Sequence, residues 1–181
     1  MNYWGLQLMS LKEKIIITDT NIITDLDTAL VLEDFVNLDN VFISDLVKRD
    51  EINYKTGNID VINNFKVISS TDSEIIEAIE LSKIERKLSI YDLNNYILAR
   101  NNNGILATGD NRLKLFAEKN NIEVIRTLKV ISYLKEHSII STEKAINALI
   151  LLKDSPTCRI PSNDIDNLIN DFNKELEFTL L

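Results

Sequence analysis

The chain alternates between short apolar runs rich in β-branched residues and longer segments whose apolar residues follow helical spacing. The apolar runs predict five strands, over residues 14–18, 40–44, 65–69, 104–109 and 123–127. Helical spacing predicts helices between them, over residues 28–38, 45–52, 70–86, 89–102 and 111–121. Because strands that alternate with helices form parallel sheets covered on both faces, the pattern predicts an α/β fold with a central parallel sheet.

The pattern becomes entirely helical after the last predicted strand. Two helices are expected over 129–153, and a final amphipathic helix follows the break made by Pro156 and Pro161. We therefore expect a domain over 14–128 and a C-terminal helical extension over 129–181, packed on the domain or on a second subunit. Residues 1–13 are expected to be a leader that is disordered or foreign to the native chain.

Four acidic residues fall at related places in this predicted order. Asp19 ends the first strand, Asp110 follows the fourth, Asp92 lies early in the helix over 89–102, and Asp50 lies in the helix after the second strand. Taken singly, Asp19 and Asp110 are also typical helix N-caps, and Asp50 and Asp92 are also typical solvated helix acids. Parallel sheets bind ligands outside the carboxyl ends of their strands, so together these acids predict an acidic site at one edge of the sheet.

Clustered carboxylates raise one another's pKa, and a bound cation offsets that repulsion. Mg²⁺ and Mn²⁺ prefer oxygen ligands, and such an ion can activate a water and neutralise charge on a phosphoryl group. Zinc sites are usually built from Cys and His, and this chain has one cysteine and one histidine, His137, in the helical region. The chemistry therefore favours Mg²⁺ or Mn²⁺.

Two other folds that place an aspartate after their first strand do not match. A haloacid-dehalogenase-type phosphatase needs D-x-D there, whereas this chain has Asp19-Thr20-Asn21. A phosphoacceptor receiver domain needs an aspartate at the end of its third strand and a lysine at the end of its fifth. The run FKVISS has no acid, and EVIRT has Arg126 in place of the lysine.

Four segments resemble the PIN domain nucleases: IIITDTNIITDL (15–26), VFISDLVKRDEI (41–52), LSIYDLNNYILA (88–99) and ILATGDNRLKLFAEKNNIEVIRTL (105–128). The resemblance implies a three-layer α/β/α sandwich with a central parallel sheet. It also implies four acids that bind Mg²⁺ or Mn²⁺ for phosphodiester hydrolysis, usually of RNA. The helices after residue 128, with STEKAINAL, resemble one branch of such proteins that carries extra C-terminal helices.

The resemblance assigns metal-ligand roles to Asp19, Asp92 and Asp110. The family usually has Glu as the second acid, and here two residues compete. Counting from the end of the second strand favours Asp50, whereas the residue type and the aliphatic residue that follows favour Glu51. Both stay open as the second catalytic and metal-binding acid.

Two further residues support the site in this interpretation. Thr108 is expected to orient Asp110 or a bound water. Asn21 is expected to tie down the loop after the first strand, because an Asx side chain readily bonds nearby backbone. Lys48 and Arg112 lie in the helices that bear the acids, where they would contact phosphate groups of a substrate.

The net charge of −8 argues against a broad non-specific nucleic-acid footprint and fits an acidic metal site. The predicted function is a cytoplasmic, Mg²⁺- or Mn²⁺-dependent endoribonuclease that acts on single-stranded RNA. The alternative is a non-catalytic PIN-like module that binds RNA or protein. RNA is the expected partner, no membrane is expected, and a homo-oligomer, an antitoxin or another protein partner stays open.

Overall fold

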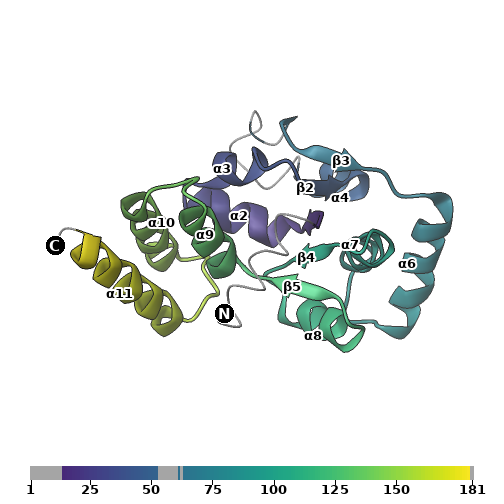
Figure 1. Cartoon of the computed structure of the whole chain (residues 1–181). Coiled ribbons are helices and arrows are strands. Elements are labelled where there is room, and N and C mark those ends of the chain that lie inside the picture. Colours follow the sequence, from purple (N-terminus) through teal and green to yellow (C-terminus); the bar gives the residue numbers. More distant parts are fainter. Residues whose placement is uncertain (1–13, 53–60, 62, 180–181) are drawn as a thin grey trace.

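The computed structural model describes residues 14–52, 61 and 63–179, so the expected leader over 1–13 lies outside the described part (Figure 1). Five parallel strands form one sheet in the order β3-β2-β1-β4-β5. The strands are β1 (Ile16–Thr18), β2 (Val41–Ser44), β3 (Lys66–Ile68), β4 (Ile105–Ala107) and β5 (Glu123–Ile125). The central parallel sheet predicted from the alternating pattern is confirmed.

The first strand, β1, is the centre of the sheet. Ile16 and Ile17 lie opposite Val41 and Phe42 of β2 on one side. On the other side β1 is in register with β4. Neighbours on both sides and helices on both faces bury every residue of β1, which explains its unbroken apolar run.

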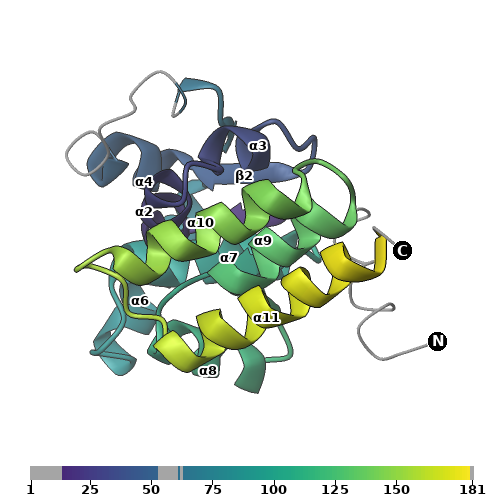
Figure 2. The same cartoon turned by 90° about the vertical axis from the view of Figure 1, so that its left-hand side faces the viewer.

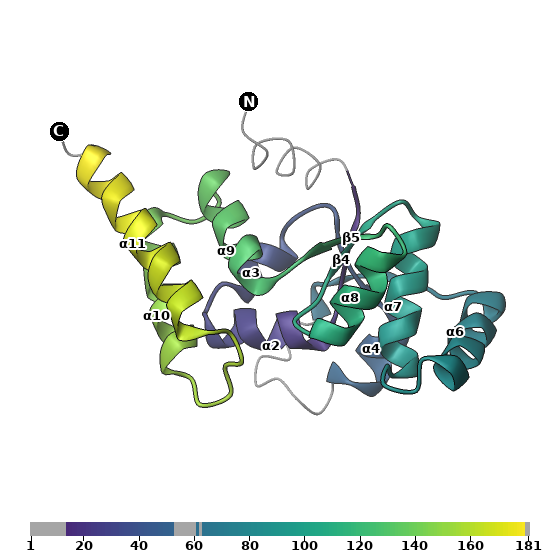
Figure 3. The same cartoon turned by 90° about the horizontal axis from the view of Figure 1, so that it is seen from below.

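Two hydrophobic clusters cover the two faces of the sheet. Ile16 of β1 packs into the cluster built with α2 (Thr20–Thr28), α3 (Leu32–Val36), α9 (Thr127–Glu136), α10 (Thr142–Asp154) and α11 (Ser162–Thr179). Ile17 packs into the other cluster, built with α6 (Asp72–Ile84), α7 (Ile90–Asn101) and α8 (Asn111–Lys119). Figure 2 shows α9, α10 and α11 in front of the sheet, and Figure 3 shows the sheet between the two groups of helices.

The C-terminal helices contribute to the first of these clusters. Ala145, Leu149 and Leu152 of α10 are at most 1% exposed. From α11, Ile165 and Phe172 enter the same cluster, and α11 packs mainly on α10. Lys135 of α9 lies over the Phe172 ring at 4.7 Å and forms an ion pair with Glu175. No helix within the described residues is both long and apolar enough to cross a membrane.

Side-chain caps define where most of the helices begin. Thr71 and Ser89 form capping boxes with Glu74 and Asp92, at the starts of α6 and α7. Ser44 accepts a hydrogen bond from the Val47 amide at 3.1 Å and caps the start of α4 (Asp45–Asp50). These local contacts explain why the starts predicted at residues 45, 70 and 89 lie within two residues of the observed starts at Asp45, Asp72 and Ile90.

The helix predicted over 28–38 is confirmed only in part, as α3 over Leu32–Val36, and α2 before it was not predicted. Residues 20–28 already form α2, directly after β1, and the short α3 begins only at Leu32. Between them Leu30 adopts a left-handed conformation with φ of 57°, which ends the first helix. The early start of α2 follows from Asp19, whose carboxylate caps the helix as the strand ends.

Candidate active site

The candidate site lies where the strand order reverses. The chain runs from β1 outward to β2 and β3, then returns to the other side of β1 with β4 and β5. Such a reversal leaves a crevice between the two neighbouring strand ends, and ligands of parallel sheets bind there. Asp19 follows β1 and Asp110 follows β4, so these two acids flank the crevice.

Asp19 is nearly enclosed, with 3% of its surface exposed. Its Oδ1 accepts a hydrogen bond from the Ile22 amide at 2.9 Å, and its Oδ2 accepts one from the Thr108 hydroxyl and one from Asn21 Nδ2 at 3.4 Å. Burial raises the pKa of Asp19 to about 6, although the hydrogen bonds from Thr108, Ile22 and Asn21 oppose the rise. The negative charge of Asp92 raises this pKa further.

Thr108 joins the two acids that flank the crevice. Its hydroxyl donates to Asp19 and accepts a hydrogen bond from the Asp110 amide at 3.0 Å. The Asp110 carboxylate caps α8, because its Oδ1 accepts from the amides of Arg112 at 2.7 Å and Leu113 at 2.9 Å. Thr108 therefore links the Asp19 carboxylate to the backbone of Asp110.

The turn that carries Asp110 packs closely on the first turn of α2. A Cβ added to Gly109 would lie 3.1 Å from the Cβ of Asn21, a contact tighter than most side chains make. Asn21 therefore meets the turn of Gly109 and the Asp19 carboxylate. The loop that Asn21 was expected to tie down does not exist, because α2 begins immediately after β1.

Arg126 is a site residue that the sequence analysis did not assign. Its guanidinium donates hydrogen bonds to the Gly109 carbonyl at 2.9 Å and to Asn111 Oδ1 at 2.7 Å. It thereby holds both residues that flank Asp110. Its position after β5 becomes informative only once β5 is known to be the neighbour of β4.

Asp92 belongs to the capping box of α7 and is half-buried. Its Oδ2 accepts from the Ser89 amide at 2.9 Å, and its own amide donates to Ser89 Oγ at 3.0 Å. Its negative charge is one of the influences that raise the pKa of Asp19.

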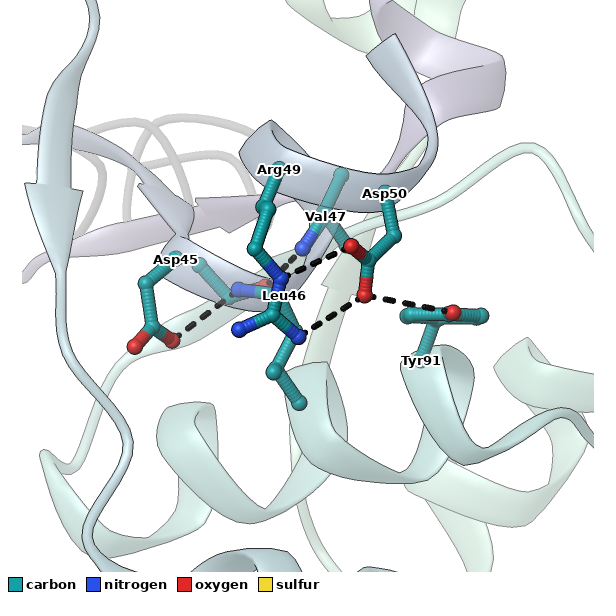
Figure 4. A network of polar contacts seen from close by, with 7 residues as sticks. Asp45, Leu46, Val47, Arg49, Asp50 and Tyr91 are labelled. Carbon is teal, nitrogen blue, oxygen red and sulfur yellow. Dashed lines mark hydrogen bonds and ion pairs between the residues drawn. The ribbon is translucent and has the colours of Figure 1, made fainter. Parts of the chain in front are cut away.

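Asp50 and Glu51, the two candidates for the second acid, have different partners. The Asp50 carboxylate accepts from Arg49 Nε at 2.7 Å and from the Tyr91 hydroxyl at 3.4 Å (Figure 4). The Arg49 guanidinium lowers the pKa of Asp50. Glu51 instead accepts a hydrogen bond from the Thr20 hydroxyl, one residue after Asp19. The structure therefore places Glu51 against the start of α2, next to Asp19, and Asp50 in an ion pair beside α7.

These acids share one edge of the sheet but do not form a ready cage. Among the described residues, no group of three or more His, Cys, Asp or Glu side chains is arranged to hold a metal ion. Asp92 and Asp110 each turn one carboxylate oxygen onto amides at the start of their own helix. The acids therefore lie at the predicted edge of the sheet, and Asp92 and Asp110 are also engaged as helix caps.

The two predicted phosphate-binding residues lie on helices that follow the second and fourth strands. Arg112 is exposed in the first turn of α8, and Lys48 is half-buried in α4. Within the described part of the chain, neither side chain makes a hydrogen bond or ion pair. Both remain predictions as substrate contacts.

Comparison with known proteins places this arrangement in a family. A family model, DUF3368, described as a PIN domain, matches residues 15–174. The chain belongs to the PIN domain family. The resemblance noted in the sequence and the α/β sandwich it implies are confirmed, and the match includes α9, α10 and most of α11.

No curated protein and no solved structure was found to match the chain. PIN domains form a nuclease-like superfamily and typically use a divalent metal ion.

Proposed function

We propose that this PIN domain is a Mg²⁺- or Mn²⁺-dependent endoribonuclease that cleaves single-stranded RNA. The observation that carries the proposal is the state of Asp19, a buried carboxylate at the switch point of the sheet with a pKa of about 6. Both burial and the neighbouring charge of Asp92 oppose its ionisation. A divalent cation bound beside Asp19 offsets both effects. For a carboxylate that served only as a helix cap, the nearby negative charge of Asp92 would bring no benefit.

The chemistry of the donor set fits a hard divalent cation, because every candidate ligand is a carboxylate oxygen. Asp19, Asp92, Asp110 and Glu51 would hold the ion. Among the described residues, Asp92 Oδ1, Asp110 Oδ2 and Glu51 Oε1 have no hydrogen-bond partner, so each of these three acids keeps one oxygen for another ligand. When bound, such an ion supplies an activated water and neutralises charge on the phosphodiester.

The chain's own residues keep these acids oriented. Thr108 fixes one oxygen of Asp19, so the carboxylate cannot rotate freely. Arg126 fixes the turn that presents Asp110. In this proposal Arg112 and Lys48 contact phosphates on either side of the cleaved bond and position the strand without reading its sequence.

Cleavage of a fluorescently labelled single-stranded RNA, with Mg²⁺, Mn²⁺ or EDTA, tests the proposal. We expect products only with the metals, and none from Asp19→Asn. Asp27→Asn is the matched control, because Asp27 is a half-buried acid of α2 whose pKa burial also raises, and its side chain makes no hydrogen bond to a site residue within the described part of the chain. Equal loss of cleavage in both variants would show that any acid of α2 is needed for folding, not catalysis.

The second candidate is a non-catalytic PIN-like module that binds RNA or another protein. It is favoured by the absence, within the described residues, of three acids arranged to hold an ion. A thermal shift separates the two functions, because an ion at 100 times its Kd stabilises the fold by about 2.7 kcal/mol, which is several degrees. If Mn²⁺ gives neither a thermal shift nor cleavage, the binding module is the better account.

A further inference from the structure

A groove of about 940 Å³ connects the acidic edge to the C-terminal helices. Asn21, Asp110 and Arg112 line its end at the sheet edge, and Arg159 and Asn167 line it from the extension. This volume is at the upper end of the roughly 300–1,000 Å³ typical of small-ligand sites, so it accommodates more than a single phosphate group. The extension is therefore one wall of a cavity that begins at a proposed catalytic acid.

Hydrogen bonds between three elements hold the floor of the groove. The Thr127 hydroxyl, at the start of α9, donates to Asp25 Oδ2 of α2 at 2.5 Å. The neighbouring Arg126 bonds the turn that carries Asp110. These contacts join α2, α9 and the start of α8, so the groove is part of the folded structure and does not depend on a ligand to form.

Arg159 is a cation of the C-terminal extension that lines this groove. It lies in the segment between α10 and α11, is exposed, and makes no hydrogen bond or ion pair within the described part of the chain. Together with Arg126 it lowers the pKa of Asp25, which burial raises, so its charge acts on the groove floor. A guanidinium without a protein partner at a cavity wall is suited to bind a phosphate through two parallel hydrogen bonds.

The charge of the groove differs from that of the whole chain. Among the described lining residues four are basic and four acidic, whereas the chain has a net charge of −8. Two of the acids, Asp164 and Asp171, belong to α11. Carboxylates accept hydrogen bonds from base amino groups, so a nucleic-acid strand can direct its phosphates to the arginines and its bases to α11.

We propose that this groove binds single-stranded RNA on one side of the cleaved bond, with Arg159 and Arg112 on its phosphates, a role that rests on the proposed ribonuclease function. The C-terminal extension is then part of the substrate site. Arg159 acts as a binding residue at a distance from the acids, and it contributes to affinity for a strand long enough to extend from the acidic edge to α11.

Fluorescence anisotropy of a labelled single-stranded RNA tests this, in EDTA so that the strand stays intact. Arg159→Ala should weaken binding about tenfold, because it removes a charge-assisted contact. It should also reduce the slope of log affinity against log salt by about 0.7, the change expected when one phosphate contact to a single strand is lost. The melting temperature should not change, since the Arg159 side chain has no hydrogen bond within the described residues.

Lys119→Ala is the matched control. Lys119 is an exposed cation at the far end of α8, and it is not among the described residues that line the groove. Its loss changes the net charge equally and should leave affinity and salt slope unchanged. An equal effect of both variants would show that only net charge matters and would overturn the groove assignment.

The remaining outcomes separate this inference from the proposed function. If the wild type cleaves RNA but Arg159→Ala binds it with unchanged affinity, the groove is not the binding site and the ribonuclease proposal stands. If Arg159→Ala alone weakens binding but no metal supports cleavage, the groove assignment stands and the ribonuclease proposal fails. Absence of RNA binding by the wild type, both in EDTA and with Mn²⁺, would overturn the groove assignment.

Discussion

Asp19 and Asp50, at the same edge of the sheet, have opposite surroundings and opposite pKa shifts. After β1, Asp19 is buried, has no cation partner, and its pKa is raised to about 6. After β2, the Asp50 side chain is 32% exposed, and Arg49, itself 68% exposed, lowers its pKa. Both acids follow an apolar strand in the sequence, yet only the surroundings of Asp19 favour the protonated, uncharged form.

The difference follows from the distance between each acid and its strand. Asp19 directly follows a strand enclosed on all sides, so its carboxylate cannot reach water. Asp50 lies at the end of α4, where the side chain can turn outward to Arg49 and Tyr91. The next residue, Glu51, turns inward to Thr20. Burial without a cationic partner, and not the place after a strand, therefore distinguishes an acid whose charge a bound cation would stabilise.

The largest expected effect is on cleavage by Asp19→Asn. Removing a ligand charge should lower kcat/KM about 1,000-fold, which corresponds to about 4 kcal/mol of transition-state stabilisation. Single-turnover cleavage of labelled RNA with Mn²⁺ measures this. Retention of more than about a tenth of the activity would show that Asp19 is not catalytic. The difference between Asp19 and Asp50 would then have no functional meaning.

The next effect is on the stability of the metal-free protein. Because folding raises the pKa of Asp19 from 3.8 to about 6, its contribution to stability is complete below pH 3.8 and is lost as the pH rises through about 6. The loss amounts to about 3 kcal/mol. Urea unfolding in EDTA across this range should show Asp19→Asn less destabilised by rising pH than the wild type.

At neutral pH this predicts that metal-free Asp19→Asn is more stable than the wild type, by less than that amount because the bond from Asn21 is lost. An asparagine remains a good helix cap, so the capping contact itself changes little. A variant less stable than the wild type by about 1 kcal/mol at every pH would mean that Asp19 is a structural cap alone.

A direct comparison of the second-acid candidates sharpens the contrast. Glu51→Gln should reduce cleavage about 100-fold, or about 2.7 kcal/mol, because it removes the charge that faces the start of α2. Asp50→Asn should change it less than about threefold, since Asp50 is already neutralised by Arg49. The opposite order in the same cleavage assay would assign the second acid to Asp50.

The smallest expected effect comes from Thr108→Val, which keeps the shape of the side chain and removes the hydroxyl. Loss of a residue that orients a ligand should reduce cleavage about tenfold. Thr108→Ser keeps the hydroxyl and should retain most activity. The hydrogen bond from Thr108 lowers the pKa of Asp19, so the valine variant should also shift the acid limb of the pH profile upward. An unshifted pH profile would mean that Thr108 has a packing role only and does not influence the ionisation of Asp19.

Much of the fold could be predicted from the sequence because its signals are local. The apolar run at residues 15–17 specifies a buried strand, and the capping boxes of Thr71 and Ser89 specify where helices begin, within four residues of themselves. The same locality explains the failure over 28–38, where the break at Leu30 has no glycine to mark it. The sequence also contains the acids Asp19, Asp92 and Asp110 at the ends and starts of elements that meet at one edge.

Only the tertiary structure decided which partners those acids have. The strand order that brings β4 beside β1 allows Thr108 to bond Asp19 across 89 residues of sequence, and β5 beside β4 allows Arg126 to hold the Asp110 turn. The different surroundings of Asp50 and Glu51 depend on Tyr91 and Thr20, which lie 41 and 31 residues away. Burial and side-chain direction arise from packing between distant segments, so no local pattern around residues 50 and 51 could have separated the acid paired with Arg49 from the acid that accepts a hydrogen bond from Thr20.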